Sequence, residues 1–313
     1  MQARAPQLIY HICAGNLAIS AWTSIAQGLL LGARNVVKLP SDREDSSARK
    51  EILEFIQSLP RPLRQMVETH RTLDPKVLSR ADVVVAFGSD ATMARLRAQV
   101  RWDQKFIAHG HALSLLWIAE PAKLTLQQAS ACAKDVLTYD QLGCLSPQAI
   151  YAPRGTKMKA LGDKLASALE SHWQKIDSKP SRPLAVAARI VEARDVAHSL
   201  GHQVWLPPQK HMGWTLIHDP ASEFQASPLH GVIYLRQVAE AQLSIALASV
   251  TGRISTVGLV GEISSRLENV FLSLGVSRFC PSGHMQFPPL TWHHDGRPTL
   301  ADMVTWTDAE RAA

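Results

Sequence analysis

The sequence predicts an α/β protein with parallel sheets and helices on both sheet faces. Short apolar strands alternate along the chain with segments of helical periodicity, which is the order expected of a parallel sheet. Residues 82–87 read DVVVAF, a continuous apolar run typical of a strand that is buried on both faces. With 313 residues, 46% of them hydrophobic, the chain is long enough for two domains and too apolar to be mainly disordered.

The expected elements follow in order from the N-terminus. In the first part we expect strands over 7–12, 35–39, 82–87 and 105–109, and helices over 17–31, 45–58 and 91–99. In the second part we expect strands over 113–118, 148–151, 203–206, 215–218 and 232–235, and helices over 124–137, 157–171 and 237–248. The chain from residue 280 onward is rich in turn residues.

Charge and cysteine content limit the class of function. The net charge of +6 suits an anionic ligand such as a nucleotide, but there is no basic run with interleaved aromatics, so we expect no nucleic-acid binding. A weaker interpretation, nucleic-acid binding driven by this charge, would require a steep salt dependence. Four widely spaced cysteines are not the pattern of a disulfide framework or a zinc ribbon, and they favour reduced thiols in a cytoplasmic protein.

Histidines occur close together at His109 and His111 and at His293 and His294. No third and fourth ligand stand at a finger-like spacing from either pair, so we expect no metal. The segment between Arg4 and Arg34 carries no charged residue, which is also seen in signal peptides and membrane spans. Polar residues interrupt its apolar runs, and we therefore expect a buried strand and helix there and no membrane span.

Four segments carry residues suited to chemistry. Asn16 follows the first strand, Lys38 ends the second, Gly88 and Ser89 join a strand to a helix, and Cys144 lies on a loop with the sequence DQLGCLSP. Each has an ordinary interpretation: a helix N-cap, a solvated charge, a tight turn and a small buried side chain. Neither a Walker A motif nor G-x-G-x-x-G is present, so a dinucleotide site would be of another kind.

Together and in this order, the four segments resemble the aldehyde dehydrogenase superfamily. Residues 278–296, RFCPSGHMQFPPLTWHHDG, are similar to the end of the LuxC-like acyl-CoA reductases, and the resemblance runs from about His11 to Trp306. It implies an aldehyde-dehydrogenase-like fold with a Rossmann-like cofactor domain over 1–111, an α/β catalytic domain over 112–275 and a tail over 276–313 packed across both.

The resemblance also bears on the N-terminus. The chain begins almost at the Asn16 loop, so an N-terminal segment of the family is expected to be lacking. Apolar surface left by that segment would be covered in a homo-oligomer or by a partner subunit.

The activity that the resemblance implies is NAD(P)H-dependent reduction of an acyl-CoA to an aldehyde. Cys144 would take the acyl group from the thioester, and the amide of Asn16 would hold the oxyanion. Lys38 would contact the adenosine ribose or its phosphate, and Gly88 and Ser89 would bring backbone N–H groups to the pyrophosphate.

Hydrolytic aldehyde dehydrogenases carry a Glu-Leu-Gly-Gly motif whose glutamate activates water, and the matching residues 108–111 here read AHGH. The missing carboxylate favours transfer to or from coenzyme A over hydrolysis. His109 or His111 could serve as a proton donor or base, and we take His111 as the candidate.

The expected cofactor is NADPH or NADH. NAD-preferring members tend to carry an acid three residues after the lysine, where this chain has Ser41 with Arg43 nearby, which slightly favours NADPH. The nearby acids Asp42 and Glu44 weaken this preference, because their charge would repel a 2′-phosphate. Two alternatives stay open: aldehyde oxidation by a related aldehyde dehydrogenase, and a truncated nucleotide-binding relative without catalysis.

Overall fold

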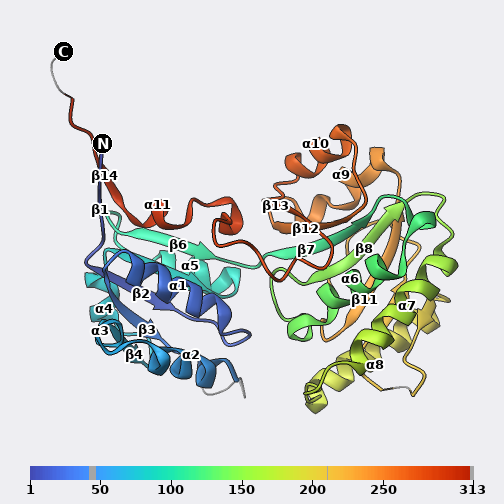
Figure 1. Cartoon of the computed structure of the whole chain (residues 1–313), viewed down its shortest axis with the longest axis horizontal. Helices are drawn as coiled ribbons and strands as arrows, with labels where there is room; N and C mark the ends of the chain where they lie inside the picture. The colour runs from blue at the N-terminus through green and yellow to red at the C-terminus, as the bar shows by residue number, and fades with distance from the viewer. Residues whose placement is uncertain (42–46, 210, 311–313) are drawn as a thin grey trace. The chain divides into compact units, whose positions relative to one another are not determined.

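The computed structural model describes residues 1–41, 47–209 and 211–310. The chain divides into two compact units. Unit 1 comprises Met1–His111 together with Trp292–Ala313, and unit 2 comprises Ala112–Thr291. Parallel sheets with helices make up both units (Figure 1), so the predicted α/β class is confirmed.

Unit 1 is built on a five-stranded parallel sheet in the order β4-β3-β2-β5-β6. Its strands are β2 (Leu8–Ile12), β3 (Arg34–Lys38), β4 (Val67–His70), β5 (Val83–Phe87) and β6 (Lys105–His109). The α-helices are α1 (Ile19–Leu30), α2 (Ser47–Ser58), α3 (Arg61–Arg64), α4 (Pro75–Arg80), α5 (Asp90–Arg97) and α11 (Thr299–Met303), with a 3-10 turn η5 (His294–Gly296). A separate antiparallel pair joins β1 (Gln2–Arg4) to β14 (Thr305–Thr307).

Helices cover both faces of this sheet because successive strand residues point to opposite sides. Tyr10 packs with Leu78 of α4 and Leu96 of α5 in one core. Val37 packs with Ile52 of α2 in the core on the other side, together with residues of α1. The continuous apolar sequence of β5, VVVAF, follows from this burial on both sides.

The end of the chain completes the core of unit 1. Met303 of α11 is buried with Ile9 and Ile107 of the sheet. The ammonium group of Lys105 donates to the carbonyl of Asp302 at 3.1 Å and also to that of Val304. The five-stranded sheet therefore depends on residues almost 200 positions further along the chain.

Unit 2 contains a seven-stranded sheet in the order β13-β12-β7-β8-β11-β10-β9, parallel except for β9 at its edge. The strands are β7 (Leu113–Ile118), β8 (Pro147–Pro153), β9 (Gln203–Trp205), β10 (Thr215–His218), β11 (Val232–Val238), β12 (Ile254–Val260) and β13 (Arg278–Pro281). The α-helices are α6 (Leu126–Leu137), α7 (Met158–Gln174), α8 (Leu184–Ser199), α9 (Leu243–Ala246) and α10 (Ser265–Ser273). Short 3-10 turns are η1 (Pro121–Lys123), η2 (Thr138–Gln141), η3 (Glu240–Gln242) and η4 (Ala248–Val250).

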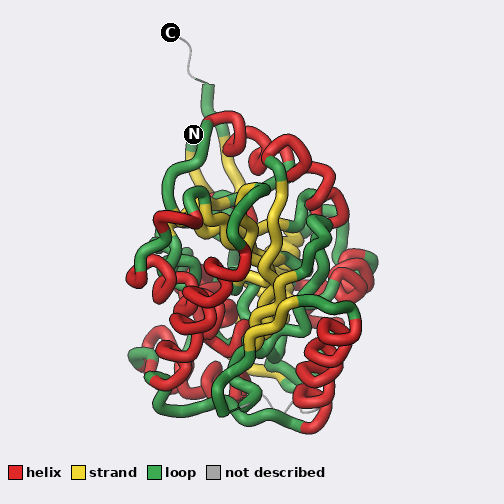
Figure 2. The backbone as a smooth tube through the Cα atoms, turned by 90° about the vertical axis from the view of Figure 1, so that its right-hand side faces the viewer, coloured by secondary structure: helices red, strands yellow, loops and turns green. Residues whose placement is uncertain are grey.

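Two apolar cores lie on opposite faces of the seven-stranded sheet. One contains Leu116 and Ile150 of the sheet with residues of α6 and α7. The other contains Leu115 and Tyr151 with residues of α8, α9 and α10. Figure 2 shows the strands in yellow with red helices on either side.

One expected helix is wrong. Residues 237–248 do not form a single helix, because β11 pairs with β8 as far as Val238 and only short helical turns follow. The helices α8 and α10 and the strand β12 were not among the expected elements. The expected helix over 45–58 begins within residues 42–46, which lie outside the described part of the chain. Within the described ranges, no helix is both long and apolar enough to cross a bilayer.

Candidate active site

The residues of unit 1 that were predicted as catalytic, Asn16 and His111, and as cofactor-binding, among them Lys38, Gly88 and Ser89, lie at one edge of its sheet. Asn16 follows β2, Lys38 ends β3, Gly88 and Ser89 follow β5, and His111 follows β6. The carboxyl ends of parallel strands share one edge, so the fold brings these residues to the same side of the sheet. Strand order reverses between β2 and β5, and ligands of open α/β sheets bind at such a switch point.

Asn16 is not the N-cap of the helix that follows it. Helix α1 begins at Ile19, its N-cap position is Ala18, and no side-chain hydrogen bond caps it. Asn16 is exposed and stands two residues before this cap. The ordinary interpretation of Asn16 as a helix cap is therefore wrong, and the structure leaves a chemical role for its amide open.

Ser89 does have a capping role. Its hydroxyl accepts a hydrogen bond from the backbone N–H of Thr92 at 3.3 Å at the start of α5. The preceding Gly88 has φ +157°, which side-chain-bearing residues rarely adopt. The N–H of Gly88 already donates to the carbonyl of His109 at 3.2 Å. The N–H of Gly88 is therefore already used in a hydrogen bond. Without a side chain, Gly88 would still let a phosphate approach the backbone closely.

Lys38 is half-buried at the end of β3, and Ser41 is exposed three residues later. The charges that entered the cofactor prediction, Asp42, Arg43 and Glu44, lie outside the described residues.

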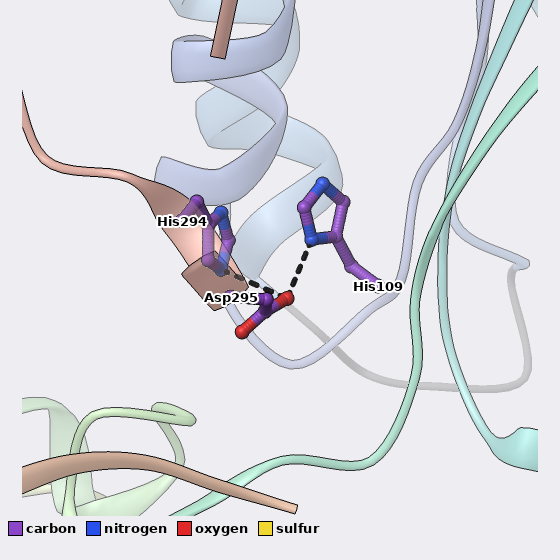
Figure 3. Close-up of side chains that lie close together, drawn as sticks. All are labelled: His109, His294 and Asp295. Carbon is purple, nitrogen blue, oxygen red and sulfur yellow. Dashed lines mark hydrogen bonds and ion pairs between the residues drawn. The ribbon is translucent and has the colours of Figure 1, made fainter. Parts of the chain in front are cut away.

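Several aromatic and histidine rings gather at the end of β6 in unit 1. Figure 3 shows two of them, His109 and His294, together with Asp295. The ring of His109 stacks on Phe87 and on His294, with centroid distances of 4.7 and 4.3 Å, and the rings of Trp292 and His294 lie 4.6 Å apart. Nδ1 of His109 hydrogen-bonds Oδ2 of Asp295 at 2.7 Å. Burial acts to raise the pKa of Asp295, but this bond and the nearby histidines hold it below its usual value. Burial lowers the pKa of His294 to about 4, so this ring is neutral at pH 7.

These side chains include a metal-ligand set, since ligand atoms of His109, His294 and Asp295 all lie within 4.8 Å of one another. Two imidazoles that share an ion direct their in-plane lone pairs at one point about 2 Å from each ring nitrogen. The planes of His109 and His294 are only 21° from parallel, so they do not meet at such a point. The observed arrangement is that of a hydrogen-bonded stack, and a shared ion would require one ring to turn.

His111, the histidine chosen from the sequence, differs from His109 in its surroundings. Its side chain is exposed, and its backbone N–H donates to Asp90 at 3.0 Å. His109 is the histidine whose ring is fixed in place by neighbours. An orienting carboxylate of this kind holds one imidazole tautomer, as in catalytic histidine pairs.

Cys144 is the cysteine, of the four in the chain, that is not buried. Cys13, Cys132 and Cys280 are buried, whereas Cys144 is partly exposed. Burial raises the pKa of the Cys13 and Cys132 thiols to about 12 and that of Cys280 to about 11. Because the thiolate is the reactive form, these three thiols are inert at neutral pH.

Several buried hydrogen bonds hold the loop that carries Cys144, which runs from η2 to β8. The side-chain amide of Gln141 donates to the carbonyl of Pro147 at 2.8 Å and so closes the loop across its base. The hydroxyl of Ser114 donates to the carbonyl of Cys144 at 2.8 Å. Gln286 donates to the hydroxyl of Ser146 at 2.8 Å. The thiol is thus presented on a tied loop, the arrangement that a positioned nucleophile requires.

The family model described as "Acyl-CoA reductase (LuxC)" matches residues 1–306. The chain belongs to the LuxC acyl-CoA reductase family. Curated relatives include the long-chain acyl-protein thioester reductases of Aliivibrio fischeri, 24% identical over 99% of this chain, and of Vibrio harveyi, 25% identical over 96%. This LuxC-family chain spans 65% and 64% of their lengths, slightly less than two thirds.

Solved aldehyde dehydrogenases share the fold. The P. syringae indole-3-acetaldehyde dehydrogenase AldA has a TM-score of 0.71 at 12% identity, covering 97% of this chain and 68% of that one. The NADP-dependent glyceraldehyde-3-phosphate dehydrogenase of Bacillus halodurans has a TM-score of 0.70 at 15% identity, covering 97% and 69%. The aldehyde-dehydrogenase-like fold predicted for this LuxC-family chain is confirmed.

The tail motif of the LuxC family contacts the neighbourhood of Cys144. Asp135 of α6 is fully buried, and its carboxylate accepts hydrogen bonds from the backbone N–H groups of Gly283 and Met285, the latter at 3.1 Å. Gln286, next in the motif, reaches Ser146. Part of this stretch thus ties α6 to the loop that carries Cys144.

Asp135 gives a pH-dependent prediction. Burial raises its pKa to about 6, although both backbone hydrogen bonds act in the opposite direction. A raised carboxyl pKa contributes stability below about pH 4 that is lost as the pH rises through 6. Relative to Asp135→Asn, the wild type should therefore lose roughly 3 kcal/mol of unfolding free energy between pH 4 and 7. Thermal or urea unfolding of both proteins across this range checks it, and parallel pH curves would contradict it.

No role was predicted for several residues that hold the Cys144 loop in unit 2 or the His109 ring in unit 1. Gln141 and Ser146 stood in the quoted loop motif, and Gln286 and Asp295 in the quoted tail, so the motifs themselves were the available signal. Their contacts join positions 140 and 186 residues apart, which no local pattern shows.

Proposed function

We propose that this chain reduces an acyl thioester to an aldehyde with a nicotinamide cofactor, through an acyl group carried on Cys144. The observation that supports it most is the one partly exposed thiol among four cysteines, on a loop tied by buried hydrogen bonds, in a member of an acyl-CoA reductase family. Relatives named as long-chain acyl-protein thioester reductases support the thioester class and a long acyl chain.

In the proposed reaction the sulfur of Cys144 attacks the thioester carbonyl, and the carrier thiol leaves with a proton. Asn16 donates its amide hydrogen bond to the oxyanion formed during this exchange. Addition of a hydride and a proton to the acyl group then releases the aldehyde and restores the Cys144 thiol. The matching residues 108–111 supply no carboxylate to activate water, which supports transfer over hydrolysis.

The residues of unit 1 fit a nicotinamide cofactor, which supplies the hydride when it is bound. The switch point between β2 and β5 is of the kind that binds dinucleotides, and Gly88 brings the backbone at the end of β5 within reach of a phosphate. Lys38 would contact the adenosine ribose or its 2′-phosphate. Ser41 presents no carboxylate at the third position after this lysine, which supports NADPH over NADH.

The acyl donor is an acyl-CoA or an acyl group on a protein thiol, which present the same thioester to Cys144. Intact-mass measurement after incubation with acyl-CoAs of several lengths, and with an acylated carrier protein, separates the two. We expect one acyl mass on the wild type and none on Cys144→Ala. NADPH or NADH should then discharge the adduct and release an aldehyde.

A folded wild-type sample without an adduct from any donor would overturn the proposal. A nucleotide-dependent thermal shift in that sample would favour a binding protein without turnover. Aldehyde consumption with NADP⁺ that needs no thiol acceptor would favour aldehyde oxidation.

A further inference from the structure

We propose that Asp140, Arg182 and His230 are positioning residues that hold the turn before Cys144 and so keep its thiol in place for acyl transfer. The inference rests on the proposed function of Cys144 and concerns residues of unit 2 alone.

The turn has a backbone conformation that its sequence does not favour. Tyr139, Asp140 and Gln141 have φ values of 56°, 54° and 62°, three consecutive left-handed residues without a glycine. A second turn contains Leu229 and His230 at φ 68° and 56°. Left-handed conformation crowds the Cβ atom of an L-residue, so a run of this kind persists only where surrounding contacts enforce it.

A charged cluster supplies one set of these contacts. The two terminal nitrogens of Arg182 donate to the two carboxylate oxygens of Asp140 at 2.8 and 2.7 Å. Nδ1 of His230 lies 2.5 Å from Oδ2 of the same carboxylate. The guanidinium of Arg182 and the carboxylate of Asp140 are only 12–13% exposed, so these two charges attract one another more strongly than surface charges do.

Gln141 supplies the second set of contacts that hold the turn, and it also connects the turn to the loop that carries Cys144. Its fully buried side chain accepts from the N–H of Gly231 at 2.9 Å and donates to the carbonyl of Val232 at 3.0 Å, which joins the two left-handed turns. The same amide donates to Pro147 on the far side of Cys144. A change in the turn at Asp140 must therefore move the loop.

This arrangement leads to a specific expectation for catalysis. Cys144 stands four residues after Asp140 on a loop of seven residues closed by Gln141. Displacement of a reacting atom by about 1 Å slows a reaction by up to about 10²-fold. Loss of the cluster should therefore slow acyl transfer to Cys144 while the sulfur stays accessible to small reagents.

The test compares two reactions of Cys144 in the wild type, Asp140→Ala, Asp140→Asn and Arg182→Lys. Acylation by the donor that works best on the wild type is followed by intact mass, and alkylation by iodoacetamide by peptide mass spectrometry. For Asp140→Ala we expect acylation about 10- to 100-fold slower and alkylation changed less than about threefold. Asp140→Asn should recover much of the rate, because asparagine tolerates the left-handed region and keeps one acceptor oxygen.

The protein contains its own folding control. The buried thiols of Cys13, Cys132 and Cys280 should stay unmodified in each variant, because they become reactive only when the fold opens. Glu120→Gln, which alters an exposed ion pair with Lys123 in the same unit, should acylate like the wild type. If Asp140→Ala does not fold, Arg182→Lys tests the same cluster, because lysine keeps the charge but cannot pair with both carboxylate oxygens.

Wild-type acylation rates in folded Asp140→Ala and Arg182→Lys would overturn the proposal. So would slow acylation accompanied by alkylation of the buried thiols. Equal slowing of acylation in Asp140→Asn and Asp140→Ala would overturn it as well. Failure of the proposed function looks different, since the wild type itself would then form no adduct.

Discussion

Replacing Asn16 with alanine is expected to slow acyl reduction about 10²- to 10³-fold, the usual cost of losing one oxyanion donor. The stability of unit 1 should change little, because Asn16 is exposed and does not cap α1. The measurement is aldehyde release under saturating cofactor, together with thermal unfolding of the same samples. A loss in the rate of acylation and in the maximal rate, with the fold intact, is the signature of an interaction made in the transition state.

Ser264→Ala provides the control for Asn16→Ala. The Ser264 hydroxyl caps α10 by accepting a hydrogen bond from the N–H of Leu267 at 3.2 Å, so its loss should cost about 1 kcal/mol of stability. Asn16→Ala should therefore lower the rate and leave the stability, whereas Ser264→Ala should lower the stability and leave the rate. A stable Asn16→Ala protein that reduces its substrate at the wild-type rate would remove Asn16 from the mechanism.

Replacing Arg236 with methionine is expected to have the largest effect on stability, about 3–5 kcal/mol in unit 2. Arg236 on β11 is 1% exposed, donates to Asp219 at 2.7 Å and to the carbonyl of Ala221 at 2.7 Å. Without the guanidinium, the carboxylate of Asp219 would remain buried without a positively charged partner. Chemical denaturation followed by circular dichroism measures the loss.

A double variant tests this reason. Because the penalty comes from the stranded carboxylate, Arg236→Met with Asp219→Asn should recover part of the stability lost in the single variant. Lys123→Met, which removes one member of an exposed pair, should unfold close to the wild type. Additive losses in the double variant would show that Arg236 stabilises the sheet through packing instead.

The sequence predicts best where the signal is local. The strands expected over 105–109, 113–118 and 215–218 coincide with β6, β7 and β10. The residues of β7 are all buried and those of β10 nearly so, and in β6 the apolar centre Phe106–Ile107–Ala108 lies between polar ends, so a short apolar stretch marks each strand. The polar residues at the carboxyl ends of β2, β3 and β5 also followed from strand order, since parallel strands end at a common edge.

The features that could not be predicted from the sequence depend on contacts between residues far apart along the chain. The pairing of His109 with Asp295 and of Asp140 with Arg182 and His230 joins segments 42 to 186 residues apart. Residues 237–248 show a helical composition, but pairing of β11 with β8 extends the strand to Val238 and overrides it. The left-handed φ values at Tyr139 and Asp140 are likewise enforced by tertiary contacts. Neither residue is a glycine, so the sequence does not indicate this conformation.

The discontinuity of unit 1 has a consequence for how the protein is made. Residues 112–291 leave the ribosome as one uninterrupted piece and can fold while synthesis continues. Unit 1 has to wait for Met303, which fills its core, and for the carbonyls of Asp302 and Val304 that bind Lys105. At about 5–20 residues per second, this leaves the sheet of β2 to β6 incomplete for roughly 10–40 s. A nascent chain that stops before residue 292 would carry a finished seven-stranded sheet and an unfinished five-stranded one.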